Sequence, residues 1–179
     1  MELFGEQGFE RTAVAEIAER AGLTERTFFR YFTDKREVLF GGSAALRDAL
    51  VGGVEAAPAS TPPLDAVVSA LAGVATGFFA DRRPYARARQ AIIAQNPELQ
   101  ERELIKLASL ASAVADTLRR RGVTEPAASL ASEAGIAIFK IAFERWVDGE
   151  EPADLVQLIH ESTERLQAMT TGRAGRARR

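Results

Sequence analysis

Residues 12–35, TAVAEIAERAGLTERTFFRYFTDK, constrain the fold most, because they read as two short helices joined by a tight turn. Thr12 stands before the first helix as a candidate N-cap, and Gly22 follows it, where a left-handed residue would end the helix. Between them, the apolar residues follow the i, i+3, i+4, i+7 spacing of one buried face: Val14, Ile17, Ala18 and Ala21. The segment therefore predicts two short helices with separate start and stop signals.

The second helix has two faces of different character. Thr24 is expected to cap it, and Phe28 and Phe32 lie one turn apart on its inner side. Two helices joined this tightly form a helix-turn-helix, and the second helix is the one that enters a DNA major groove. The alternative is a plain helical hairpin that binds no DNA. The outer side of the helix favours a read-out face, since it carries Glu25, Arg26, Thr27, Phe29 and Arg30.

The run GFERTAVAEIAERAGLTERTFFRYFTDKREVLF resembles the N-terminal signature of the tetracycline-repressor (TetR) family of bacterial transcription regulators. The shared pattern is Gly-Phe, a threonine, Ile-Ala and Ala-Gly in the first helix, an aromatic-rich second helix and Lys-x-x-x-Leu. With the cap Thr24, the resemblance implies a DNA-binding surface of two parts. Base edges are approached by the positions that match Glu25, Arg26, Thr27, Phe29 and Arg30, and phosphates by those that match Thr12, Tyr31 and Lys35.

The chemistry of these side chains suits double-stranded DNA. Arg26 or Arg30 can pair bidentately with a guanine, and Phe29 can cover a thymine methyl group. The net charge of -2 and the pI near 5.6 provide no general attraction to nucleic acid, so binding has to come from a local patch. The positive side chains do cluster between Arg26 and Arg36, and affinity should depend strongly on salt.

The chain departs from the family pattern at its start. Family members usually begin well before the Leu-Phe of the first helix with a basic segment, whereas Met1 stands close to Leu3 and Phe4. We therefore expect a helix-turn-helix domain over residues 1–40 that is shortened at its N-terminus, unless the native start lies upstream. A helical interaction protein with a vestigial helix-turn-helix is the alternative that this shortening suggests.

Other function classes find little support in the residue types. The chain has no cysteine and one histidine, His160, so a thiol nucleophile, a disulfide and a His-x-x-x-His metal pair are all excluded. No Gly-rich phosphate loop is present either. We expect no catalytic activity, no cofactor and no metal site. Because no run of 18 apolar residues and no signal peptide occurs, the expected protein is cytoplasmic and makes no membrane contact.

Periodicity predicts an all-α chain with a helical second domain over residues 41–171 and a disordered tail over 172–179. The clearest linker is AAPASTPP, at residues 56–63. The expected helices beyond residue 35 run from Lys35 to about Ala57, from Leu64 to about Asp81, from Pro84 to before Asn96, from Pro97 to Arg121, up to Val147, and from near Pro152.

The helix that ends near Val147 is apolar nearly all round, and such a helix must be covered on every side. We expect it to pair, with the last helix, against a twofold-related copy, with Trp146 and Leu166 near the edge of that contact. A homodimer would place two recognition helices about one DNA turn apart on a palindrome. The alternative is a fully internal helix in a monomer. The residues that carry this argument are Ile136, Ile138, Phe139, Ile141 and Phe143.

The remaining helices are expected to enclose a pocket for a small hydrophobic effector. Gly73 and Gly77 each cost a helix about 1 kcal/mol against alanine, so they need a reason such as close packing or room for a ligand. For each candidate lining residue, plain core packing is the alternative. The candidates are Phe78, Phe79, Ile92, Ile93, Leu107, Leu110, Ala111, Phe139 and Phe143.

The segments RPYARARQAIIAQNPELQERELIKLASLASAVADTLRRRG and FKIAFERWVDG resemble one C-terminal type of the same family, which is associated with acyl-CoA-like ligands. This resemblance implies an acyl chain inside the pocket and a charged headgroup near Arg82, Arg83, Arg87 or Arg89. Together the two resemblances imply a dimeric repressor that a lipophilic ligand, acyl-CoA or fatty-acid-like, releases from a palindromic operator. An antibiotic or another hydrophobic drug is the alternative effector.

Overall fold

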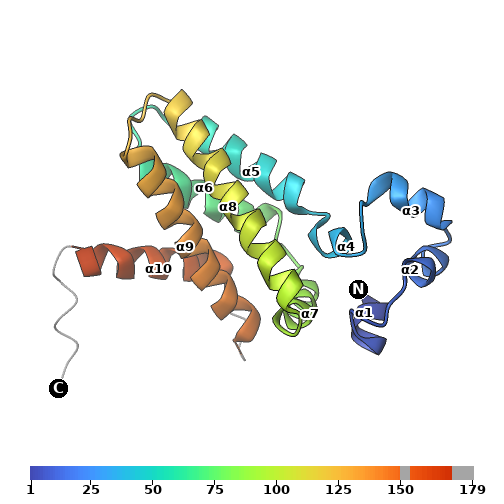
Figure 1. The fold of residues 1–179 in the computed structure, drawn as a ribbon. Helices are drawn as coiled ribbons and strands as arrows, with labels where there is room; N and C mark the ends of the chain where they lie inside the picture. The colour runs from blue at the N-terminus through green and yellow to red at the C-terminus, as the bar shows by residue number, and fades with distance from the viewer. Residues whose placement is uncertain (150–153, 171–179) are drawn as a thin grey trace, which may run out of the picture.

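The structure, a computed structural model, describes residues 1–149 and 154–170, and these form helices only (Figure 1). The predicted all-α class is confirmed. The tail over residues 172–179 lies outside the described residues. Within the described part, no helix is both long and apolar enough to cross a membrane. The helices are α1 Glu2–Gln7, α2 Val14–Arg20, α3 Glu25–Tyr31, α4 Glu37–Phe40, α5 Ser43–Ala56, α6 Pro63–Gly77, α7 Arg83–Ala94, α8 Pro97–Arg120, α9 Ala127–Asp148 and α10 Leu155–Thr170.

Helices α1–α3 form a small lobe at one end of the molecule, and α5–α10 form a larger bundle (Figure 1). The short helix α4 lies between the two. A compact apolar cluster joins the lobe to the bundle, because side chains of α1 and the following loop meet side chains of α4, α7 and the start of α8. Its buried members are Phe4, Phe9, Leu39, Phe40, Ile92, Ile93 and Leu99.

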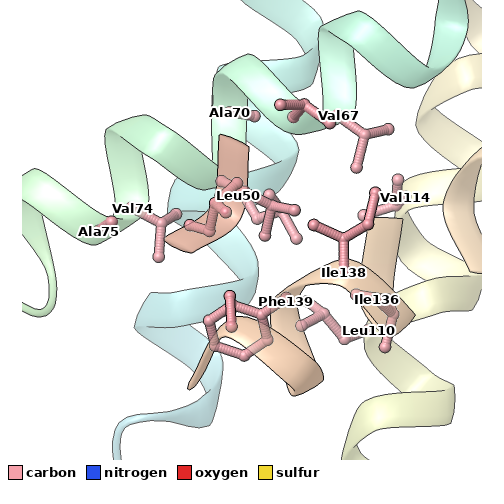
Figure 2. Close-up of a cluster of buried hydrophobic side chains, with 14 of the residues drawn as sticks. Leu50, Val67, Ala70, Val74, Ala75, Leu110, Val114, Ile136, Ile138 and Phe139 are labelled. Carbon is pink, nitrogen blue, oxygen red and sulfur yellow. The ribbon is translucent and has the colours of Figure 1, made fainter. Parts of the chain in front are cut away.

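The main core lies within the bundle, where α9 packs against α6, α7, α8 and α10. Figure 2 shows Leu50 and Val67 from α5 and α6 directed toward Ile138 of α9. Gly135 permits the close approach of α6, since a Cβ atom there would lie 2.3 Å from Val67 Cγ1. This central position of α9 explains why its sequence is apolar nearly all round.

The expectation that a second subunit must cover α9 is therefore corrected for most of its apolar residues. Ile136, Ile138 and Phe139 are 7%, 2% and 5% exposed, because helices of the same chain cover them. Trp146 is buried among aromatic rings rather than at an outer edge. Ile141, which is 51% exposed, is the residue of this set that stays open to solvent.

The expected helix boundaries are confirmed around the linker at residues 56–63, which separates α5 from α6. A continuous helix from Lys35 to Ala57 was wrong, because Gly41 and Gly42 interrupt it between α4 and α5. A Cβ atom at Gly42 would lie 3.0 Å from the Phe78 ring, so the break brings this backbone against the end of α6. Helix α6 ends at Gly77, four residues before the expected Asp81.

Candidate nucleic-acid interface and ligand cavity

Helix α3 has the start and the turn that the sequence predicted. Thr24 adopts an extended N-cap conformation, and its Oγ1 accepts the backbone N–H of Thr27 at 3.2 Å. Gly22, in the corner before it, has a φ of 67°, the left-handed conformation that glycine adopts without strain. The predicted Thr24 cap and Gly22 turn are confirmed, and together they fix the direction in which α3 leaves the turn.

The two faces of α3 separate as expected. Phe28 is buried at 2% exposure and stacks on Phe32, with ring centroids 5.1 Å apart. Phe29, on the opposite face, is 54% exposed and touches Phe28 edge-on at 5.4 Å. Glu25, Arg26 and Arg30 are exposed as well, and Thr27 is half-buried. Helix α3 thus presents an uncovered face with an aromatic ring and two guanidinium groups.

Arg30 and Tyr31 form a paired group at the end of this face. An Nη2 hydrogen of Arg30 is donated to the Tyr31 hydroxyl at 3.0 Å, and the guanidinium carbon lies 4.9 Å from the centre of the ring. Tyr31 is 67% exposed, so both groups are open to solvent. Stacking restricts the long arginine side chain and holds it at the surface beside a second hydrogen-bonding group.

Lys35 lies in a different setting from the one its expected phosphate contact requires. Its Nζ donates to the backbone oxygens of Phe9 at 2.8 Å, Glu10 at 3.1 Å and Thr12 at 3.3 Å. The same ammonium group lies 4.4 Å from the centre of the Phe9 ring. These three carbonyls account for all three N–H donors of the group. Lys35 therefore ties the loop between α1 and α2 to the segment that follows α3.

Thr12 is also directed inward. It is 1% exposed, and its hydroxyl donates to the backbone oxygen of Gly8 at 2.8 Å. The expected cap at Thr12 was wrong, because the N-cap of α2 is Ala13, whose N–H is bound by the Glu16 side chain at 2.8 Å. Helix α2 therefore begins one residue later than a cap at Thr12 would place it.

The basic cluster is narrower than the sequence indicated, since Arg36 is paired. Its guanidinium binds Asp34 Oδ2 at 2.6 Å, and Asp34 Oδ1 accepts the backbone N–H of Arg36 at 2.8 Å. The hydrogen bond from Arg36 lowers the pKa of Asp34, and burial opposes this only in part. Among the described residues, Arg26 and Arg30 have no carboxylate partner, so they carry the positive charge of the α3 face.

A cavity of about 830 Å³ lies in the larger lobe, with walls from α4, α5, α7, α8 and α9 and from Phe78 and Phe79 after α6. Two expected lining residues lie elsewhere. Ile92 packs in the cluster that joins the two lobes, and Ala111 packs in the main core. Helical periodicity marks both as inward-facing but does not distinguish a core from a cavity wall. The expected residues that line the cavity are Phe78, Phe79, Ile93, Leu107, Leu110, Phe139 and Phe143.

Gly73 and Gly77 line a second, smaller cavity of about 490 Å³ on the α5–α6 side. Neither glycine lines the larger cavity, so the lack of a side chain at these positions does not enlarge the space for a ligand in it. Nothing within 4 Å would meet a Cβ atom at either position. The helical cost of these two glycines has no explanation in close packing.

Two of the four candidate headgroup arginines line the larger cavity. Arg82 lies over the Phe78 ring at 4.8 Å, and Arg89 binds Glu103 at 2.8 Å. Arg83 is turned away, since its Nε donates to the backbone oxygen of Trp146 at 2.7 Å. Arg87 is exposed and does not line the cavity. The cavity is also lined by polar residues that the sequence did not single out: Arg47, Tyr85, Gln90, Gln100, Lys106 and Lys140.

Basic residues of α7 and α8 hold α4 in place, and two of them, Arg89 and Lys106, line the cavity. Lys106 Nζ binds Glu37 Oε2 at 3.2 Å, and Arg102 Nε binds Glu37 Oε1 at 2.9 Å. Burial alone would raise the pKa of Glu37, but the hydrogen bonds from Arg102 and Lys106 outweigh it and lower that pKa. Arg89 adds a hydrogen bond from Nε to the backbone oxygen of Leu39 at 2.8 Å. Because these partners lie 50 or more residues from α4, no local pattern could have identified them.

Two family models match this chain. The one described as "Bacterial regulatory proteins, tetR family" matches residues 1–40, and the one described as "MftR C-terminal domain" matches residues 61–171. The first match therefore covers α1–α4, with the helix-turn-helix, and the second covers α6–α10, of which α7–α9 supply most of the cavity wall.

Named proteins resemble the chain over different lengths. The HTH-type transcriptional regulator TcmR of Streptomyces glaucescens is 40% identical over 74 residues, which are 41% of this chain and 33% of TcmR. The chain thus spans about a third of the length of TcmR. The transcriptional regulator MftR of Mycobacterium tuberculosis H37Rv is 28% identical over 153 residues, or 84% of this chain and 77% of MftR.

Among solved structures, Thermus thermophilus FadR, a TetR-family transcriptional repressor in complex with lauroyl-CoA, has a similar fold. The TM-score is 0.54 at 21% sequence identity, with 100% of this chain and 92% of the FadR chain covered. At this level of identity the similarity concerns the fold.

Proposed function

The chain belongs to the TetR family of bacterial regulatory proteins, and from this premise we propose that it is a dimeric, ligand-responsive transcriptional repressor. It binds a palindromic operator without ligand, and a small lipophilic ligand in the larger cavity releases it. One observation carries the proposal: the chain has an uncovered recognition helix on one side of α4, and on the other side a cavity whose basic wall residues hold α4.

The DNA contacts are assigned to the exposed face of α3. Arg26 and Arg30 are the donors for a guanine, and Phe29 is the apolar contact for a thymine methyl group. Glu25 and Thr27 lie on the same face, and Tyr31 borders it with a hydroxyl suited to a phosphate. Thr24 sets the angle of the helix through its cap. Lys35 and Thr12 support the interface from inside the lobe, because their polar groups are bound there.

The ligand is assigned to the cavity of about 830 Å³. Its aromatic and aliphatic walls suit a hydrocarbon chain, and the basic residues at the wall, Arg82 and Arg89 among them, suit an anionic headgroup. The lauroyl-CoA in the FadR structure supports an acyl-CoA or fatty-acid-like ligand. An antibiotic or another hydrophobic drug is the competing ligand class.

The response is assigned to α4. A ligand headgroup that draws Lys106 or Arg89 toward itself weakens the bonds that these residues make to Glu37 and to the Leu39 carbonyl. The α3 lobe then changes its position relative to the bundle, and two recognition helices no longer match successive major grooves. To change the ratio of the two arrangements from 1:99 to 99:1, the ligand must bind one of them more tightly than the other by about 5.5 kcal/mol.

The homodimer is assigned to the outer face of α9. TetR regulators act as dimers, and α9 has an apolar stripe at helical spacing on its outer side, exposed except at the half-buried Ala134: Leu130, Ala134, Ala137 and Ile141. Leu130 and Ile141 are 66% and 51% exposed. A second copy would bury this stripe and present two α3 helices to one operator.

The experiment that tests the proposal is a selection of bound sites from random duplex DNA, repeated with lauroyl-CoA. An enriched palindrome that is lost when lauroyl-CoA is added supports both the regulator and its ligand class. If a palindrome is enriched but lauroyl-CoA does not release it, the DNA-binding function is supported and the acyl-CoA ligand is rejected. No enrichment would mean that the helix-turn-helix is only a scaffold and that the proposal is wrong.

A further inference from the structure

The side-chain oxygen of Gln90, on α7, is buried without a hydrogen-bond partner among the described residues. Its side chain lines the larger cavity. In the part of the chain that the structure describes, Gln90 Oε1 is the one buried side-chain oxygen or nitrogen without a hydrogen-bond partner. Buried polar atoms in folded proteins nearly always have a partner, and an acceptor left unpaired destabilises the state that contains it.

The wall around the cavity does not supply the missing donor, since no side chain among the described residues donates to Gln90 Oε1, and several donors of the wall are bound elsewhere. Arg89 donates to the Leu39 carbonyl and to Glu103 at 2.8 Å each, and Lys106 donates to Glu37 at 3.2 Å. Ser109 donates to the carbonyl of Ile105 in its own helix at 2.9 Å. The partner of Gln90 Oε1 is therefore left to a small molecule that occupies the cavity, either water or a ligand.

Along α7, the neighbours of Gln90 at helical spacing in the cavity wall are apolar. Ala86 and Ile93 lie one turn before and one turn after it, both line the cavity, and both are buried. Gln90 is thus a polar side chain between two apolar residues of the wall, and its Oε1 is buried there. Gln100 provides a contrast, since it lines the same cavity but is exposed, and its Nε2 already donates to the Ala94 carbonyl at 2.8 Å.

We propose that Gln90 determines the specificity of the cavity, and that the ligand is an amphiphile with a hydrogen-bond donor, a hydroxyl or an amide N–H, which binds Gln90 Oε1. This inference rests on the proposed function, in which the cavity binds a lipophilic ligand. A plain hydrocarbon chain fills the same space but leaves the oxygen buried and unpaired. A site built around such a polar atom rejects the analogue that lacks its partner.

The test compares dodecanoic acid with a series of hydroxydodecanoic acids that place the hydroxyl at successive positions along the chain. Binding to the full chain is measured by isothermal titration calorimetry. At least one hydroxylated acid should bind the native protein roughly fivefold more tightly than dodecanoic acid, as one hydrogen bond provides. In Gln90→Leu this preference should disappear while dodecanoic acid still binds. The matched control Gln100→Leu should retain the preference.

Thermal unfolding of both variants establishes that they fold. If Gln90 Oε1 is satisfied by water alone, the hydroxylated acids bind no better than dodecanoic acid, or the ratio is the same in Gln90→Leu, and the inference is overturned. If no acid of the series binds at all, the lipophilic ligand class fails together with the inference. The DNA selection described above is independent of the acids, so it distinguishes that outcome from a failure of the regulator itself.

Discussion

At the scale of single residues, two basic side chains of the first lobe have opposite tasks. Arg30 lies outside on α3, where it stacks on Tyr31 and has no carboxylate partner among the residues that the structure describes. Lys35 lies inside, with its three donors on the carbonyls of Phe9, Glu10 and Thr12. From charge alone, both side chains would be expected to contact DNA. In the structure, Arg30 lies on the exposed face of α3, whereas Lys35 holds backbone segments of the lobe together.

Lys35→Met is expected to destabilise the first lobe, because three carbonyls lose a charged donor at once. The expected loss in the free energy of unfolding is about 2 kcal/mol, as for hydrogen bonds to a charged group. Urea unfolding, followed by circular dichroism, measures it. The dependence of DNA affinity on salt should stay nearly unchanged in this variant.

Arg30→Ala is the matched contrast, since it should leave the free energy of unfolding unchanged and weaken operator binding by roughly 1–3 kcal/mol. An equal loss on all DNA sequences would make Arg30 a phosphate contact. The assignment of Lys35 would be wrong if its variant kept full stability and lowered the slope of log affinity against log salt by about 1.

At the scale of elements, α4 is too short to be stable by itself, because a four-residue helix does not offset its nucleation cost. Its position is set by side chains of α7 and α8: Arg89 on the Leu39 carbonyl, and Arg102 and Lys106 on Glu37. The glycines at 41 and 42 separate it from α5. Helix α4 is therefore a connecting piece whose place depends on the bundle.

Glu37→Gln should lower the free energy of unfolding by up to about 1 kcal/mol at pH 7, since the amide loses the charge that pairs with Arg102 and Lys106. The pKa of Glu37 is lowered in the folded chain. Its contribution to stability is therefore present above the ordinary glutamate pKa of 4.5 and is lost as the pH falls through the folded value. The difference between the native protein and Glu37→Gln, measured by urea unfolding across pH 3–7, should shrink toward the acid end. A difference that stays constant with pH contradicts the ion-pair account.

Two helical glycines should respond to alanine in opposite directions. Gly135→Ala places a Cβ atom 2.3 Å from Val67 Cγ1, so α6 and α9 have to move apart and the free energy of unfolding should fall by about 1–3 kcal/mol. Gly73→Ala meets nothing within 4 Å and should raise it by up to about 1 kcal/mol. Urea unfolding of both variants decides. Equal effects would mean that packing at Gly135 is not the deciding term.

At the scale of the whole molecule, the lobe of α1–α3 and the bundle of α5–α10 lie on either side of α4 (Figure 1). The α3 face is open at one end, while the cavity and the apolar stripe of α9 belong to the bundle. A single α3 helix contacts one half-site, and high affinity for a palindrome requires two of them at a fixed distance. Dimer geometry is therefore part of DNA recognition in the proposed function.

The double variant Leu130→Asp/Ile141→Asp should dissociate the proposed dimer, because two carboxylates would have to be buried in an apolar contact. Sedimentation velocity should show a monomer, and affinity for a full palindrome should fall to that for a half-site. Ile105→Asp is the control, since Ile105 is 50% exposed on α8 and lies outside the stripe. Dissociation of the control, with the double variant still dimeric, would place the interface elsewhere.

The features that the sequence predicted correctly are those that depend on residues close together along the chain. The Thr24 cap, the left-handed Gly22, the linker at residues 56–63 and the all-α class were all predicted correctly, because each follows from residues within a few positions of one another. The two faces of α3 followed from helical periodicity in the same way. For the cavity, periodicity identified inward-facing residues, and most of the expected ones line it.

What the tertiary structure alone decided is which neighbour each of these residues meets. Lys35 reaches carbonyls 23 to 26 residues away, and Glu37 meets Arg102 65 residues along the chain. Ile92 and Gln90 stand two positions apart on α7, yet one packs in the cluster between the lobes and the other lines the cavity. Spacing along a helix determines the direction of a side chain, but only the packing of distant helices determines whether it meets core, cavity or a charged partner.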